Sequence, residues 1–135
     1  MARTTRRSRC PIATSLDIFG DRWSLLIVRD LMFKGRASFG EFIAAGEDIA
    51  TNILADRLVR LERAGIIRRA SHPGDRRKAI YGLTPKGLDL APVMLELTLW
   101  AARHERIETP AAELNAMKRR RAKFLSDTRK TAQRA

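Results

Sequence analysis

The sequence has little of what enzymes and metal proteins depend on. Its 135 residues include one cysteine, two histidines and one tyrosine. One cysteine excludes an internal disulfide framework. His72 and His104 lack the cysteine or carboxylate companions of a zinc site, so we expect neither a metal site nor a cofactor. No glycine-rich phosphate loop and no nucleophile–base set stands in the sequence, which argues against an enzyme.

Long apolar runs are also lacking. No stretch of about 18 apolar residues occurs, so we expect no membrane span. The polar segment 1–9 is followed by no apolar run of the kind found in secretory signals, which indicates a cytoplasmic protein. The length and the 44% share of hydrophobic residues suit one globular domain with its own core.

Acidic residues are few compared with basic ones. The chain has 27 lysines and arginines against 15 acids, a net charge of +12. Such an excess points to a polyanionic partner, most commonly nucleic acid, with an anionic membrane surface as the alternative. Residues 1–9 carry four arginines and no acid, and residues 117–135 carry eight basic residues and one acid. These ends are either solvated tails or arms that lie along phosphate groups.

Hydrophobic periodicity and capping residues predict four helices in the first half of the chain. Asp21 and Ser38 are expected to cap the second and third helices, with Glu41 completing a capping box. Asp48 is a candidate cap for the fourth helix, and Gly65 suits its C-terminal end. The predicted helices are Pro11–Phe19, about Trp23–Leu31, about Phe39–Ala45 and Ala50–Ala64.

A hairpin and a long helix are predicted next. Ile66–His72 and Arg77–Leu83 read as strands joined through residues 73–75. A helix that begins at Thr84-Pro85 is apolar on almost every side through Trp100, with a bend expected at Pro92. Helices followed by a basic hairpin predict a mainly α fold with a small β-hairpin wing (α+β), a winged helix-turn-helix. A further helix is expected after Thr109-Pro110.

Several segments resemble HxlR-type transcriptional regulators. They are C-P-I-x-x-x-L-D-I-x-G-D-R-W-S-L-L-I-x-R-D-L at residues 10–31, F-x-E-F at 39–42, L-x-x-R-L-x-x-L-E-x-x-G-I-I-x-R at 54–69, Y-G-L-T-P-K-G at 81–87 and P-V-M-x-x-L-x-x-W at 92–100. Ile49-Ala50-Thr51 stands where such proteins usually have I-S-P, and the wing at 72–77 is closer to the MarR type. The resemblance implies a domain at residues 10–105, between a basic arm at 1–9 and a basic helical extension at 106–135.

The resemblance further implies a bacterial DNA-binding homodimer on a pseudo-palindromic operator, and we expect a repressor. The first helix and the long C-terminal helix would form the dimer. The apolar side chains of the C-terminal helix could instead line an effector pocket along the same seam. The expected interface residues are Ile12, Leu16, Val93, Leu97 and Trp100.

The helix at 50–64 carries the expected base-reading residues. Asn52, Asp56 and Arg60 are spaced i, i+4, i+8 and share one face. Asparagine can pair with adenine, the methyl groups of Thr51 and Ala55 can pack on thymine, and Arg57 and Arg60 can take guanine or phosphate. The alternative is a solvated face with Asp56 and Arg60 as a surface pair. The predicted DNA-binding residues of this helix are Thr51, Asn52, Ala55, Asp56, Arg57 and Arg60.

Further contacts are expected outside that helix. Arg76, Arg77 and Lys78 at the hairpin tip suit the minor groove or its phosphates, or are simply a charged turn. Ser38 is placed to touch phosphate, although capping alone also explains it.

Cys10 is a candidate sensor of thiol-reactive compounds, as in some regulators of the family. Arg9 and the helix that begins at Pro11 both favour its thiolate. A reversible disulfide of this lone cysteine must be intermolecular or with a small thiol. The alternative role is a small packing residue at the dimer interface.

The sequence therefore predicts a DNA-binding transcriptional regulator, acting on double-stranded DNA at the nucleoid, with an oxidant or small-molecule effector. The alternative is a sequence-indifferent protein that coats nucleic acid.

Overall fold

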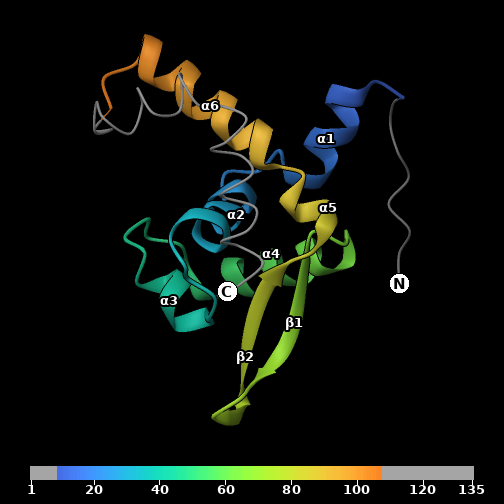
Figure 1. Ribbon diagram of the computed structural model, residues 1–135, viewed down its shortest axis with the longest axis vertical. Helices are drawn as coiled ribbons and strands as arrows, with labels where there is room; N and C mark the ends of the chain where they lie inside the picture. Colours follow the sequence, from blue (N-terminus) through green and yellow to red (C-terminus); the bar gives the residue numbers. More distant parts are fainter. Residues whose placement is uncertain (1–8, 108–135) are drawn as a thin grey trace.

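The computed structural model describes residues 9–107, and within that range the chain forms six helices and one two-stranded antiparallel hairpin (Figure 1). The basic arm expected at residues 1–9 and the helix expected after Thr109-Pro110 lie, apart from Arg9, outside the described residues. No helix within the described range is long and apolar enough to cross a bilayer. In chain order the elements are α1 (Pro11–Phe19), α2 (Ser24–Phe33), α3 (Phe39–Ile43), α4 (Thr51–Arg63), β1 (Ile67–His72), β2 (Asp75–Leu83), α5 (Pro85–Leu88) and α6 (Ala91–His104).

One face of α4 anchors the hydrophobic core. Leu54, Leu58 and Leu61 are at most 2% exposed, and their spacing puts them on one side of the helix. They join apolar side chains of α2, the hairpin base and α6, including Val28, Ile67 and several others. Burying a leucine fully contributes roughly 1.5–3 kcal/mol, so this stripe fixes which side of α4 faces outward.

Glycine turns the chain out of α4 into the hairpin. Gly65 has φ +78°, a left-handed conformation that residues with a side chain rarely adopt. The Ile66 amide donates to the Leu61 carbonyl at 3.0 Å, closing the end of the helix. The C-terminal glycine predicted from the sequence is confirmed.

The base of the hairpin is held against α5. The Thr84 hydroxyl donates to the carbonyls of Gly65 and Ile66, and the Gly87 amide donates to that hydroxyl at 3.1 Å. A Cβ on Gly87 would lie 2.2 Å from the Ile66 carbonyl oxygen, so only glycine fits this approach. The predicted Thr84 cap with proline next to it is confirmed.

The hairpin is longer on its second strand than the sequence indicated. Pairing runs from Ile67 opposite Leu83 to Ser71 opposite Ala79, then jumps so that His72 pairs with Asp75. Because of this jump, β2 begins at Asp75 rather than at the predicted Arg77, and residues 76–78 bulge from the ladder.

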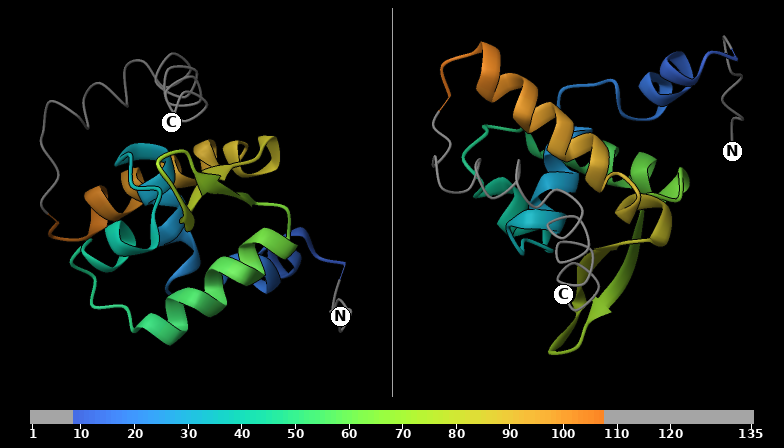
Figure 2. Two further views of the ribbon diagram at one scale, coloured as in Figure 1. Left: turned by 90° about the horizontal axis from the view of Figure 1, so that it is seen from below. Right: turned by 45° about the horizontal axis from the view of Figure 1, so that its top comes forward.

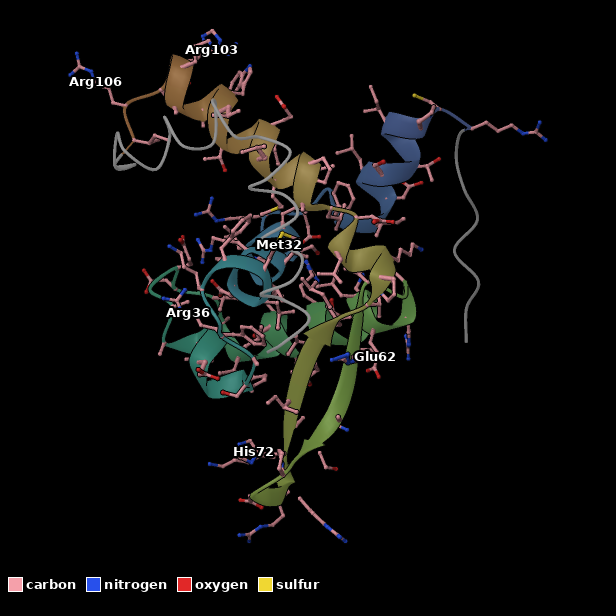
Figure 3. The ribbon with its side chains drawn as sticks, in the orientation of Figure 1. Met32, Arg36, Glu62, His72, Arg103 and Arg106 are labelled. Carbon is pink, nitrogen blue, oxygen red and sulfur yellow. The ribbon has the colours of Figure 1, made fainter. Side chains whose placement is uncertain are left out.

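A buried carboxylate ties α2 to the loops around α3. Asp30 is 3% exposed, and it accepts hydrogen bonds at 2.9 Å from the guanidinium groups of Arg29 and Arg36. Arg29 also pairs with Glu47 at 2.9 Å, beyond α3. Burial lowers the pKa of Arg29, but Glu47 and Asp30 outweigh burial and leave it raised. We call Asp30, Arg29, Arg36 and Glu47 the Asp30 cluster; Figure 3 labels Arg36 beside α3.

Two sequence predictions about helix boundaries were wrong. The expected single helix from Thr84, bent at Pro92, is two helices, α5 and α6, separated at residues 89–90. Pro92 lies in the first turn of α6, where its missing N–H costs nothing, so it starts a helix instead of bending one. Asp48 does not cap α4, because its own φ of 59° is left-handed and Ala50 occupies the cap position without a side-chain bond.

The predicted Ser38 cap is confirmed, whereas the cap position of α2 is taken by Trp23, and Asp21 bonds to the start of the helix from two residues earlier. The Asp21 carboxylate accepts from the amides of Trp23 and Ser24 at 3.0 and 3.1 Å, just before α2. Ser38 and Glu41 form the reciprocal capping box at the start of α3. Hydrogen bonds from the Ala37 amide and from Ser38 lower the pKa of Glu41, which keeps its carboxylate charged for this role.

Candidate nucleic-acid interface

The side of α4 opposite the core is exposed and mostly polar. Thr51, Asn52, Ala55, Asp56 and Arg60 are all exposed, as the periodicity predicted. Seen from below, α4 runs along one flank of the molecule, and none of the other helices and strands of residues 9–107 covers its outer side (Figure 2, left). The helix can therefore meet a groove along most of its length.

Arg60 and Arg57 of α4 differ in how strongly they are held by ion pairs within the protomer. Arg60 and Asp56 face each other at 3.8 Å, and both side chains are about half exposed. Such a surface pair contributes little to stability, so the Arg60 guanidinium stays available to a ligand, whereas Asp56 also pairs with Arg57.

Arg57 turns toward the start of α2. Its Nε donates to the Asp21 carboxylate at 2.8 Å, its guanidinium also pairs with Asp56, and its side chain is only 19% exposed. Burial raises the pKa of Asp21, but hydrogen bonds from Ser24, Arg57 and the Trp23 amide outweigh burial and lower it. The charged Asp21 thus links the N-terminal end of α2 to the middle of α4.

The hairpin extends away from the helices as a wing (Figure 1). Arg76, Arg77 and Lys78 are exposed, and all three stand in the bulge of β2. A bulge re-aims side chains away from the ladder, so these cations are presented together. The Gly74 amide donates a hydrogen bond to Nδ1 of His72 at 2.9 Å, which stabilises the turn at the tip of the wing. Figure 3 labels His72 at this tip.

Ser38 lies at the inner end of the wing. It forms a bridge with Ile80 of β2, and the neighbouring Ala37 carbonyl accepts from the Tyr81 amide at 2.8 Å. Its hydroxyl serves the capping box and is only partly exposed. The structure thus places Ser38 between α3 and the wing.

The first and last described helices carry unpartnered apolar faces. None of the residues of α1 is buried, and the helix stands apart from α6 in both views of Figure 2. On α6, the exposed apolar side chains of Val93, Leu97 and Trp100 have i, i+4, i+7 spacing. The centre of the Trp100 ring lies 5.3 Å from the centre of the His104 ring. The exposed fractions are 71% for Ile12, 58% for Leu16, 37% for Val93, 49% for Leu97 and 57% for Trp100.

Cys10 is exposed and immediately precedes α1, whose first residue is Pro11. Its carbonyl accepts from the Thr14 amide at 2.9 Å, so its backbone already belongs to the helix start. The structure therefore places the thiol at the end of the helix that exposes Ile12 and Leu16.

Sequence reasoning missed two ion-pair partnerships and one exposed side chain that shape this interface. Asp30 and the partnership of Asp21 with Arg57 involve residues that only the fold brings together, so no local signal marks them. Val59, 45% exposed on the outer side of α4, carried a signal that was overlooked. It continues the four-residue spacing of Thr51 and Ala55.

Comparison with known proteins finds helix-turn-helix transcriptional regulators. The HxlR-like helix-turn-helix model matches residues 18–109. The HTH-type transcriptional regulator sll1512 of Synechocystis is 35% identical over 88 residues, which span 65% of this chain and 64% of the relative. The chain thus spans slightly less than two thirds of that relative's length.

Two regulators offer solved structures. The HTH-type transcriptional regulator YodB of Bacillus subtilis is 37% identical over 68% of this chain and 82% of its own. Its reduced form superposes with a TM-score of 0.59 at 33% identity, over 72% of this chain and 95% of that one. The oxidised form of the redox regulator HypR superposes with a TM-score of 0.64 at 28% identity, over 73% of this chain and all of that one.

Proposed function

Because the chain belongs to the HxlR-like helix-turn-helix family of DNA-binding transcriptional regulators, we propose that it is a repressor that binds a pseudo-palindromic operator as a homodimer. The observation that carries the proposal is the pairing of an exposed polar α4 face with a cationic wing bulge. The first suits the major groove, and the second suits the minor groove or its phosphates.

Each protomer would lay α4 in one major groove. Asn52 is suited to adenine, and the methyl groups of Thr51 and Ala55 to thymine. Arg60 is suited to guanine, with Asp56 either orienting it or accepting from cytosine. Arg57 has less freedom to reach a base, because Asp21 holds its Nε, and its remaining donors are suited to phosphate.

The wing and α3 would fix the position of the protein on the duplex. Arg76, Arg77 and Lys78 neutralise phosphates or enter the minor groove beside the helix, and Ser38 approaches phosphate from the other side of the wing base. The dimer would set two half-sites about 34 Å apart, one turn of the double helix.

Arg60→Ala tests base reading by α4. We expect it to remove about 1–3 kcal/mol of discrimination between operator and random duplex, the contribution of one good base contact. The matched control is Arg103→Ala, which removes the same charge at the far end of α6, labelled in Figure 3. The measurement is competition binding of operator DNA, recovered from the organism's own genome with the protein, against random duplex at physiological salt.

Two outcomes would contradict the proposal. Equal losses of operator and random affinity would mean that Arg60 touches only phosphate. The second outcome concerns the unaltered protein. If random duplex displaces it from the operator in proportion to the concentration of random duplex, the protein coats nucleic acid without regard to sequence.

Cys10 is proposed to make the repressor respond to thiol-reactive compounds. The thiol is exposed at the start of α1, the helix that we assign to the dimer interface. Among similar proteins, YodB has been solved treated with diamide and bound to quinone, and HypR is a redox regulator. Two Cys10 thiols, one from each protomer, would lose two electrons and two protons to the oxidant and form one disulfide. Alternatively, each Cys10 thiol and one small thiol would together lose two electrons and two protons to the oxidant and form a mixed disulfide.

Cys10→Ser is expected to abolish this response. Operator affinity of the unaltered protein should fall after diamide treatment and recover with a reductant, whereas the Cys10→Ser protein should bind equally before and after treatment. Affinity is measured by fluorescence anisotropy on the same duplex. A diamide response that persists in the Cys10→Ser protein would remove the cysteine from the account.

A further inference from the structure

The outer side of α4 is divided into two rows of side chains. Thr51, Ala55 and Val59 follow one another at four-residue spacing, and all three are exposed. A step of four residues advances about 40° around an α-helix, so such a row follows the helix at an incline of about 26° to its axis. A second row, parallel to the first, is polar: Asn52, Asp56 and Arg60. The outer face thus presents an aliphatic row beside a hydrogen-bonding row.

Val59 is the largest member of the aliphatic row, and packing within the protomer does not explain a valine at this position. Its side chain is 45% exposed and takes no part in the core, which α4 reaches through the opposite stripe. A β-branched residue also loses side-chain freedom in a helix, so helix propensity does not favour valine here. Single exposed apolar residues are common on proteins, so it is the place of Val59 in the row that carries the argument.

We propose that Val59 is a specificity-determining residue that packs against a thymine 5-methyl group in the major groove. The inference rests on the proposed function, because it assigns α4 to that groove. Thymine is the base that offers a methyl group there, and an aliphatic side chain is the complementary surface.

The row predicts a spacing of thymines in the half-site. Four residues advance about 6 Å along α4, and bases follow one another at about 3.4 Å along one strand. Ala55 and Val59 are therefore about two base steps apart when α4 lies along the groove. The half-site should contain thymines at roughly this spacing, beside bases that hydrogen-bond with the polar row.

Replacing thymine by deoxyuridine tests the contact, since it removes the methyl group and leaves base pairing unchanged. Each thymine of an operator half-site is replaced in turn, and affinity is measured for the unaltered protein and for Val59→Ala. At one position, we expect the replacement to weaken the unaltered protein about fourfold, the effect of one buried methyl group. The same replacement should leave Val59→Ala unaffected.

Glu62→Ala is the matched control, because it truncates another exposed side chain of α4 that belongs to neither row; Figure 3 labels this residue. It should keep the full sensitivity to deoxyuridine. Alanine is also a better helix former than valine, so Val59→Ala is expected to fold.

Three results would overturn the inference, and they can be told apart. If deoxyuridine weakens Val59→Ala as much as the unaltered protein at every position, Val59 reads no methyl group. If Val59→Ala lowers dimer formation instead, the side chain belongs to a protein contact. If the unaltered protein does not prefer operator to random duplex, the proposed function fails, and this inference fails with it.

Discussion

Leu97→Asp should separate the protein into protomers and lower operator affinity by about a hundredfold or more. Leu97 is the middle residue of the exposed apolar stripe of α6, with Val93 and Trp100 on either side. In the proposed dimer the new carboxylate would be buried in an apolar contact without a partner, which costs several kcal/mol. A separated protomer keeps one half-site and loses the effective concentration by which the first bound half promotes the second, commonly a factor of 10² or more.

Sedimentation velocity measures the first effect and anisotropy on the operator duplex measures the second. Leu97 is exposed and outside the protomer's own core, so the circular dichroism of Leu97→Asp should match that of the unaltered protein. Arg103→Ala on the same helix should stay dimeric and retain binding. A Leu97→Asp protein that remains dimeric at micromolar concentration would remove α6 from the interface.

Asp30→Ala should lower the free energy of unfolding by about 3 kcal/mol. Removing one member of a buried ion pair typically costs about 3–5 kcal/mol, because it leaves the other charge unpaired. The side chains of Arg29 and Arg36 are 23% and 33% exposed, and Arg29 keeps Glu47, so we expect the lower end of that range. Loss of the Asp30 cluster should also let α3 move relative to α2. Because α3 carries Ser38 at its start, operator binding should weaken as well.

Urea denaturation at a fixed protomer concentration measures this change, since the stability of a dimer depends on concentration. Asp30→Asn keeps the shape of the side chain and should cost less than Asp30→Ala, which separates the loss of charge from the loss of volume. Glu62→Ala, an exposed carboxylate of α4, is expected to stay within about 0.5 kcal/mol of the unaltered protein. An equally small change in Asp30→Ala would mean that the cluster does not hold α2 and α3 together.

The parts of the fold that depend on local chemistry could be predicted from the sequence. Residues 11–19 begin with a proline and precede a glycine, and α1 has these bounds. The Ser38–Glu41 capping box and the turn at Gly65 involve residues at most a few positions apart, and both are present. The outward face of α4 followed from the spacing of Leu54, Leu58 and Leu61.

What escaped prediction depends on residues that are distant in sequence. Arg57 reads as a free cation of α4, yet the fold brings Asp21, 36 residues earlier, within 2.8 Å of its Nε. In the sequence, Asp30 looks like any other polar residue of α2. Only the fold brings Arg36 to Asp30 and Glu47 to the neighbouring Arg29. The break between α5 and α6 escaped because apolar residues continue through it, and hydrophobic periodicity alone does not detect such an interruption.

The central claim, that two protomers together recognise one specific duplex, is tested most directly by sedimentation equilibrium of the protein with its genomic target in excess random DNA at physiological salt. The account predicts a complex whose mass is that of the labelled target duplex plus two chains of 15.3 kDa. A 15.3 kDa protein sedimenting apart from that duplex would contradict it.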